Sequence, residues 1–129
     1  MIIDSSAVIA ILRQEPDAER FATILASSTV KFMGAPTYLE TCMVIAGRRS
    51  DVSAGRVNAF IRDAEILLLP FTSTASLVAV DAFLRFGKGR HPARLNFGDC
   101  ISYAIAKTEL MPLLFKGDDF RLTDVEAAL

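Results

Sequence analysis

The chain alternates between short apolar runs, typical of buried strands, and longer segments that carry apolar residues at helical spacing. The short runs predict strands at 2–4, 29–34, 65–70 and 111–115. The remaining segments predict helices at 7–12, 16–27, 35–47, 53–64, 74–86, 101–110 and 123–129. Because strands separated by helices form parallel sheets covered on both faces, the pattern predicts an α/β fold, a three-layer α/β/α sandwich with a central parallel sheet.

Capping signals mark the starts of most of these helices, since a side-chain oxygen there can accept a hydrogen bond from a free backbone N–H. The expected single caps are Ser5 or Ser6, Thr72 or Ser73, and Thr123. Two segments have the spacing of a capping box, Thr37–Glu40 and Asn96–Asp99, the second with Asp in place of Glu.

The position of apolar residues also predicts which parts of these elements are buried. The uninterrupted run at 65–70 is expected to be a central strand. The helix after residue 35 should bury Leu39, Met43, Val44 and Ala46, and the helix at 53–64 should bury Val57, Phe60, Ile61 and Ala64. The helix at 74–86 should bury Leu77, Val80 and Leu84, with some of Val78, Ala82 and Phe83.

Length and composition narrow the class of protein. The 129 residues, 52% of them apolar, are expected to form one domain, 1–129, with a substantial core. No apolar run reaches the roughly 18 residues of a membrane span, and no basic segment precedes Asp4, so neither a membrane span nor a signal peptide is expected. Cys42 and Cys100, without a CxxC motif, are typical of buried thiols in a reducing cytosol, which predicts a cytoplasmic protein.

Acidic residues recur where a predicted strand stops or a helix begins. Asp4 ends the first strand, Glu40 and Asp99 lie in the first turns of helices, and Asp118 and Asp119 follow the last strand. In an open parallel sheet, functional sites form beyond the carboxyl ends of the strands, so all of these acids are expected at one edge. Ionised carboxylates in one cleft repel one another unless a cation lies between them.

The kind of ligand predicts the kind of cation. Hard oxygen ligands without a cluster of His or Cys select Mg²⁺ or Mn²⁺ over Zn²⁺. Mg²⁺ takes one or two protein carboxylates and leaves its other positions to water and substrate phosphate, which suits phosphodiester hydrolysis. Taken singly, Glu40 and Asp99 are also sensible capping residues, and the other acids could be ordinary loop or turn charges. Their shared edge favours the metal site, and a capping carboxylate can still bind a metal.

A basic loop at 87–95 precedes Asp99 and contains no acid. Its cations, together with Arg85, could form a solvated face or a contact for substrate phosphates. The net charge of −1 gives no general attraction to nucleic acid, so any such binding must come from a local patch. The place of the loop just before an acid of the site favours phosphate contact by Lys88, Arg90 and Arg94. His91 is expected to be exposed and is not a candidate general base.

Four stretches of the chain together resemble the PIN-domain family and, within it, the VapC-type toxins, which are the ribonuclease halves of bacterial type II toxin–antitoxin pairs. They are Met1–Ala7, Tyr38–Thr41, Leu95–Cys100 and Leu114–Phe120. The resemblance covers essentially the whole chain. It implies a PIN-like fold and an endoribonuclease site that depends on Mg²⁺ or Mn²⁺.

The resemblance also implies roles for individual residues. Asp4, Glu40 and Asp99 carry over as the main acids of the site, with Asp4 and Asp99 as metal ligands. Both Asp118 and Asp119 qualify as the fourth acid, and Asp119 is favoured because it directly precedes Phe120. Ser6 matches a small hydroxyl residue that supports the first Asp, and Asn96 is expected beside the site.

The partners that the resemblance implies are an RNA substrate, with tRNA or rRNA as candidates, and a small cognate antitoxin. The antitoxin would lay its C-terminal segment over the helices between 7 and 64 and bring an Arg toward the acids, which attract a guanidinium. The chain is expected to form a homodimer, or a heterotetramer or larger assembly with the antitoxin.

Other interpretations explain the pattern less well. A haloacid-dehalogenase-type domain expects Asp-x-Asp after its first strand, but Ser5 and Ser6 follow Asp4. A receiver domain expects a central strand that ends in Asp, but the run at 65–69 leads into Pro70. A non-catalytic binding module with a decayed site is disfavoured because no acidic position is missing.

Overall fold

The computed structural model describes residues 1–47 and 54–128. The elements run in the order β1 (Ile2–Ile3), α1 (Ser5–Leu12), α2 (Ala18–Ser27), β2 (Phe32–Gly34), α3 (Ala35–Gly47), α4 (Ala54–Asp63), β3 (Leu67–Leu69), α5 (Ser73–Phe86), α6 (Phe97–Thr108), β4 (Leu113–Leu114) and the 3₁₀ helix η1 (Phe120–Leu122). The strands form one parallel sheet in the order β3-β2-β1-β4, with Ile2 of β1 opposite Phe32 and Leu113.

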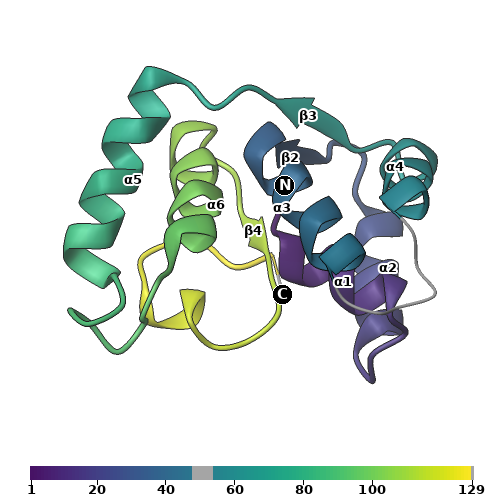
Figure 1. Cartoon of the computed structure of the whole chain (residues 1–129), viewed down its shortest axis with the longest axis horizontal. Coiled ribbons are helices and arrows are strands. Elements are labelled where there is room, and N and C mark those ends of the chain that lie inside the picture. The colour runs from purple at the N-terminus through teal and green to yellow at the C-terminus, as the bar shows by residue number, and fades with distance from the viewer. Residues whose placement is uncertain (48–53, 129) are drawn as a thin grey trace.

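The sheet separates two hydrophobic cores, because successive side chains of a strand point to opposite faces. Ile3, Met33 and Leu114 pack with α1, α2, α3 and α4 in one core. Ile2 and Leu113 pack with α5 and α6 in the other. Figure 1 shows these two helical groups on either side of the short strands. The predicted three-layer α/β/α fold with a central parallel sheet is therefore confirmed.

The position of β3 differs from the prediction. It is an edge strand rather than a central one, and Leu67 and Leu68 are 63% and 43% exposed. An uninterrupted apolar run is typical of a buried strand, but here only one long edge of the strand pairs, with β2. The two central strands are β1 and β2.

The C-terminal segment also differs from the prediction of a helix at 123–129, of which the structure describes 123–128. The 3₁₀ helix η1 ends at Leu122. The hydroxyl of the next residue, Thr123, accepts from the N–H of Val125 at 3.3 Å instead of capping a new helix. The chain then runs beside β4, where Leu113 N–H donates to Glu126 O at 2.8 Å and Ala128 N–H donates to Leu113 O at 2.9 Å. Sheet pairing thus replaces the expected helix.

The buried faces of two helices were predicted wrongly. On α3 the buried residues are Thr37, Thr41 and Ile45, whereas Leu39 and Met43 are 59% and 65% exposed. On α5 the buried residues are Ala75 and Ala82, whereas Leu77, Val80, Leu84 and Phe83 are exposed. Apart from Ile45, the buried side chains of these two helices are small or bear a hydroxyl, whereas Leu39, Leu77 and Leu84 stay exposed. The predicted face of α4 is confirmed by Val57 and Ile61, which are both buried.

The helix caps were predicted in part. Thr72 caps α5 and accepts from Ala75 N–H, and Asn96 and Asp99 form the full capping box of α6. The cap of α1 is Asp4 rather than either serine. The Thr37–Glu40 box does not form, because α3 already begins at Ala35 and Thr37 lies inside it. The predicted start at Ser53 lies outside the described residues.

Within the two ranges that the structure describes, no helix is both long and apolar enough to cross a membrane.

Candidate metal centre

Asp4 stands where β1 passes into α1, and its carboxylate is almost fully buried, with 3% of the residue exposed. Its Oδ2 accepts from the backbone N–H of Ser6 at 2.9 Å and from the Ser6 hydroxyl at 2.6 Å. Its Oδ1 accepts from the hydroxyl of Ser102 at 2.6 Å. Three donors therefore hold this carboxylate in a single orientation.

Asp99 and Glu40 come to the same place from α6 and α3. The capping box fixes Asp99, because its Oδ2 accepts from Asn96 N–H at 2.8 Å while Asn96 Oδ1 accepts from Asp99 N–H at 3.0 Å. Gly98 lies directly against the Glu40 carboxylate, since an added Cβ on Gly98 would be 2.8 Å from Glu40 Cδ. The absence of a side chain at Gly98 thus leaves the room that Glu40 occupies.

Burial and the charges of neighbouring acids both raise pKa values at this site. Burial raises the pKa of Asp99 to about 6, and the charges of Asp4 and Asp119 add to the rise, although the N–H of Asn96 opposes it. Burial also raises the pKa of Glu40, helped by the charges of Asp4 and Asp99 and opposed by the hydroxyl of Ser5. Four predicted acids, Asp4, Glu40, Asp99 and Asp119, therefore share one electrostatic environment at the carboxyl edge of the sheet.

The two candidates for the fourth acid differ in their surroundings. Asp119 adds to the rise in the pKa of Asp99. The side chain of Asp118 is 92% exposed and lies 3.6 Å from Arg121. The turn that holds both is tied to the site, because the backbone N–H of Lys116 donates to Ser6 Oγ at 3.0 Å. The geometry favours Asp119.

The donor set fits a hard divalent cation that keeps most of its own water. Every candidate ligand is a carboxylate oxygen, and the mutual repulsion of the acids would be relieved by positive charge between them. Within residues 1–47 and 54–128, no three His, Cys, Asp or Glu side chains come close enough to hold one ion together. This arrangement suits Mg²⁺, which is commonly held by only one or two protein carboxylates.

Ser102 was missed by the sequence analysis, although it touches the central acid of the site. It lies inside the most buried helix of the chain, where a serine resembles any other small helix residue. The one sequence feature that pointed to a role for Ser102 in the site was its place three residues after Asp99, on the same face of the helix.

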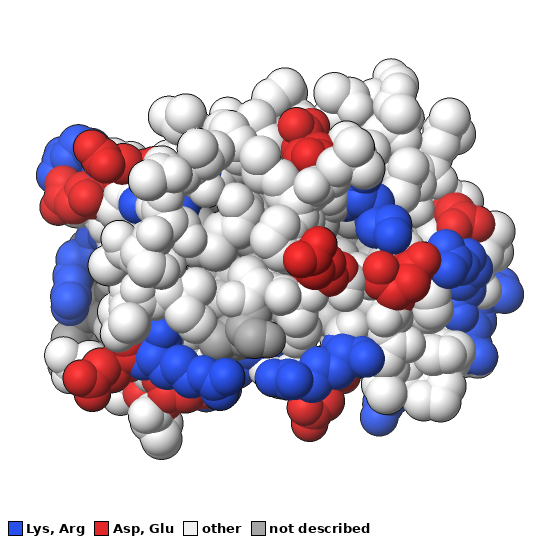
Figure 2. Space-filling view, turned by 180° about the vertical axis from the view of Figure 1, so that it is seen from behind, with Lys and Arg blue, Asp and Glu red and all other residues white. Residues whose placement is uncertain are grey.

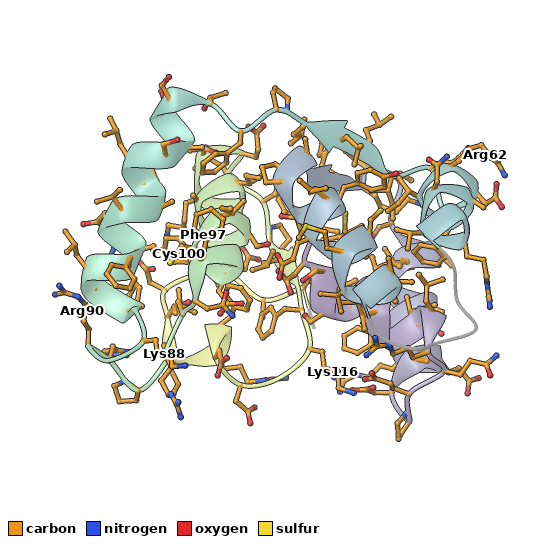
Figure 3. All side chains as sticks on the ribbon, viewed as in Figure 1. Arg62, Lys88, Arg90, Phe97, Cys100 and Lys116 are labelled. Carbon is orange, nitrogen blue, oxygen red and sulfur yellow. The ribbon has the colours of Figure 1, made fainter. Side chains whose placement is uncertain are left out.

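The basic loop is ordered by its own backbone. Lys88 N–H donates to Leu95 O and Leu95 N–H donates to Phe86 O, each at 3.0 Å, so the loop closes at its base. The loop surrounds a hollow of about 530 Å³ lined by Lys88, Gly89, Arg90, His91, Pro92 and Arg94. Figure 3 labels Lys88 and Arg90 at the end of α5, and Figure 2 shows basic side chains gathered at that end of the molecule.

His91 is not the exposed side chain that was expected. It is half-buried, its ring packs edge-on against Phe86 with centroids 5.2 Å apart, and its Nδ1 accepts from Ala93 N–H at 3.1 Å. These contacts give His91 a structural role within the loop.

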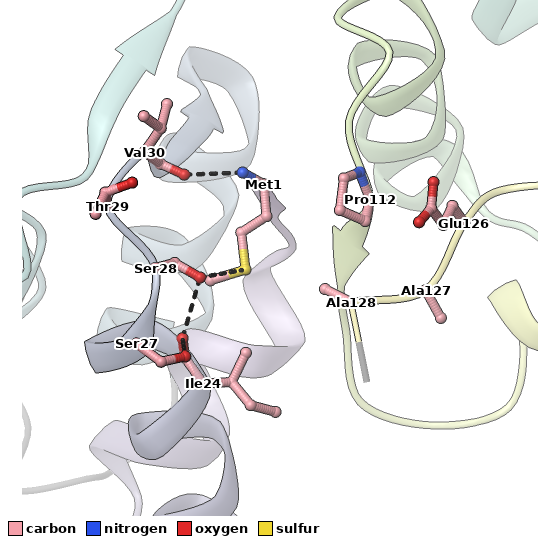
Figure 4. A pocket seen from close by; sticks show the side chains of 10 residues that line it. All are labelled: Met1, Ile24, Ser27, Ser28, Thr29, Val30, Pro112, Glu126, Ala127 and Ala128. Atoms are coloured by element: carbon pink, nitrogen blue, oxygen red, sulfur yellow. Dashed lines mark hydrogen bonds between the residues drawn. The ribbon is translucent and has the colours of Figure 1, made fainter.

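A different hollow, of about 630 Å³, lies at the opposite edge of the sheet (Figure 4). Met1, Val30 and Pro112 line it, and each precedes a strand, whereas the acids follow strands. The amino group of Met1 donates to Val30 O at 2.8 Å. Apart from this amino group, Glu126 is the one ionisable group in its lining, so this hollow has little of the chemistry of the acidic edge.

The fold and the acidic edge define a class, the parallel α/β domains whose carboxylates meet beyond the strand ends. The PIN domain family model matches residues 1–126. The chain therefore belongs to the PIN-domain family, as the sequence motifs predicted. This membership also sets aside the receiver and haloacid-dehalogenase interpretations.

Curated relatives match the chain over nearly its full length. It is 45% identical over 127 residues to "Ribonuclease VapC" of Mycolicibacterium smegmatis, covering 98% of each chain. It is 45% identical over 130 residues to "Ribonuclease VapC28" of Mycobacterium tuberculosis, covering 100% of this chain and 98% of the relative. The predicted likeness to VapC-type ribonucleases is thus confirmed.

Two solved structures share the fold at 15% sequence identity. Mycobacterium tuberculosis VapC20, described as a sarcin-ricin loop cleaving toxin, aligns with a TM-score of 0.76 over 96% of this chain and 95% of its own. A toxin–antitoxin complex from Klebsiella pneumoniae aligns with a TM-score of 0.69 over 92% of this chain and 88% of that chain.

Proposed function

We propose that this protein is the toxin of a toxin–antitoxin pair and acts as an endoribonuclease that depends on Mg²⁺ or Mn²⁺. The observation that carries the proposal is that Asp4, Glu40, Asp99 and Asp119 share one electrostatic environment at the carboxyl edge of a PIN-domain fold. Relatives that are named ribonucleases and match nearly the whole chain support the same activity.

The roles of the acids follow from their surroundings. Asp4 and Asp99, each fixed by hydrogen bonds, would bind the cation, with Glu40 beside them. When bound, a divalent cation supplies charge stabilisation and a water activated for attack on a phosphodiester. Asp119 lies on an exposed turn, from which it can approach the substrate. Ser6 links Asp4 to the turn that carries Asp119, because it accepts from Lys116 N–H and donates to Asp4.

The basic loop would bind the phosphate groups of the RNA. Lys88, Arg90 and Arg94 are exposed and surround one hollow, and Arg94 stands five positions before Asp99. Such charges bind a nucleic acid backbone without reading its sequence. A structured RNA, such as a tRNA or an rRNA loop, is the proposed substrate class, and the described specificity of VapC20 for the sarcin-ricin loop is one example.

The protein partners we propose are a small antitoxin and a second copy of this chain. The names of the relatives and the complex from Klebsiella pneumoniae support the antitoxin. The acidic edge would attract an arginine side chain of the antitoxin by the same field that attracts a cation.

The test is RNA cleavage by protein purified away from any antitoxin. Cleavage of a structured RNA should require Mg²⁺ or Mn²⁺ and stop on addition of EDTA. Asp4→Ala and Asp99→Ala should abolish cleavage, whereas Asp63→Ala, which removes an exposed acid on α4, should leave it unchanged. Full activity in Asp4→Ala or in EDTA would disprove the metal site.

A further inference from the structure

Two buried hydroxyl groups, those of Ser102 and Thr37, adjoin Asp4. Ser102 Oγ donates to Asp4 Oδ1 at 2.6 Å and lies 3.4 Å from Thr37 Oγ1. Ser102 and Thr37 are each only 1% exposed. Thr37 is held in turn by α3, where the Thr41 hydroxyl donates to Thr37 O at 2.8 Å. A buried hydroxyl costs free energy unless it is hydrogen-bonded. These contacts therefore explain how the hydroxyl groups of Ser102 and Thr37 can be buried.

The spacing of these hydroxyls matches that of the acids. Thr37 stands three residues before Glu40 on α3, and Ser102 stands three residues after Asp99 on α6. Residues three apart on a helix lie on the same face, one turn from each other. Each hydroxyl is therefore one helical turn from an acid, and together they join α3 and α6 to Asp4.

The hydrogen bonds of Asp4 assign different tasks to its two oxygens. A carboxylate oxygen has two lone-pair positions. Those of Oδ2 are both taken, by the backbone N–H and the hydroxyl of Ser6. Among the residues that the structure describes, Oδ1 accepts only from Ser102, so Oδ1 is the oxygen with a lone-pair position open to a cation.

We infer that Ser102 is a positioning residue that holds Oδ1 of Asp4 in the orientation that binds the divalent cation, and that Thr37 supports Ser102 from α3. The cation itself rests on the proposed function, whereas the orientation of Asp4 does not depend on it. Partners of this kind typically change metal affinity by about ten- to a hundredfold when they are removed.

The test compares four variants with the wild type. Ser102→Ala removes the donor, Ser102→Cys fills the same space with a weak donor, and Ser102→Thr keeps the hydroxyl. Ser76→Ala is the matched control, because Ser76 is an exposed helix serine whose hydroxyl bonds only a backbone carbonyl among the described residues. The readouts are the Mn²⁺ dissociation constant from calorimetry, thermal unfolding in EDTA, and crystal structures of the metal-free proteins.

We expect Mn²⁺ affinity to fall about ten- to a hundredfold in Ser102→Ala and Ser102→Cys, while Ser102→Thr and Ser76→Ala stay close to the wild type. All four proteins should unfold cooperatively in EDTA. In metal-free Ser102→Ala, the Asp4 carboxylate should rotate away from its wild-type position. An unmoved Asp4 carboxylate, or wild-type Mn²⁺ affinity in Ser102→Ala, would overturn the inference. If the wild type binds no Mn²⁺ but Asp4 still rotates in Ser102→Ala, the positioning role holds and the proposed metal site fails.

Discussion

A methyl group added at Gly98 should disable the site without harming the fold. The new Cβ of Gly98→Ala would be 2.8 Å from both Cδ and Oε1 of Glu40 and closer still to Oε2. Ordinary contacts begin near 3.4 Å, so the Glu40 carboxylate must move by at least about 0.6 Å. Gly98 lies in the first turn of α6, where alanine favours the helix by up to about 1 kcal/mol.

Stability and activity should therefore change in opposite directions. We expect Gly98→Ala to unfold in EDTA at the wild-type temperature or slightly above it. Its rate of RNA cleavage should fall by about ten- to a hundredfold, because displacement of a catalytic group on the order of 1 Å is enough for such a loss. Gly47→Ala is the matched control, since among the described residues no atom beyond its chain neighbours and its own helix backbone lies within 4 Å of the Cβ that it would add.

A double-mutant cycle isolates the cause. If the methyl group acts through Glu40, Gly98→Ala should have no further effect on cleavage in a Glu40→Ala background, because the two changes remove the same interaction. Cleavage by Gly98→Ala within twofold of the wild type, or additive losses in the double variant, would refute this reasoning.

Three further predictions concern pH, the basic loop and oligomeric state. The folded pKa of Asp99, about 6, lies above its ordinary value of 3.8, so the folded state binds the proton more readily. In EDTA, urea unfolding should therefore show that Asp99 adds on the order of 2 kcal/mol of stability between pH 7 and pH 4. Asp99→Asn should lose this contribution, while Glu40, whose pKa is also raised, still adds its own in the same direction. Replacing both Lys88 and Arg90 with Glu should weaken RNA binding in a filter assay. The salt dependence of binding should fall by the amount expected for about two lost phosphate contacts. Unchanged binding would show that the loop does not contact the RNA. Leu77→Glu and Leu84→Glu, both exposed on α5, should shift the protein to a monomer in sedimentation if α5 forms the homodimer contact, with stability unchanged.

The places of the acids could be predicted from the sequence because they depend on topology. Asp4 directly follows β1, and Asp118 and Asp119 come shortly after β4, so a parallel sheet brings them to one edge whatever the exact strand lengths. The capping box of Asn96 and Asp99 is a local pattern of four residues, and it formed as expected.

The contacts that orient those acids could not be predicted in the same way. Ser102 reaches Asp4 across 98 positions of sequence, and nothing local to either residue announces the contact. The space that Gly98 leaves for Glu40 likewise depends on how closely α3 and α6 pack, which is a property of the folded state. Sequence patterns thus identified the chemical groups, and the tertiary packing determines their geometry.

Several of the errors in the predicted core point to a surface. Leu67 and Leu68 on β3, and Leu77 and Leu84 on α5, were all expected inside and are all exposed. The top of the molecule, where Figure 1 places β3 and the start of α5, is also largely free of charged side chains in Figure 2. Apolar patches of this kind are typical of surfaces that another protein covers. The apolar pattern at these positions therefore fits burial in an assembly better than burial within one chain, which is the reason to seek the homodimer contact on α5.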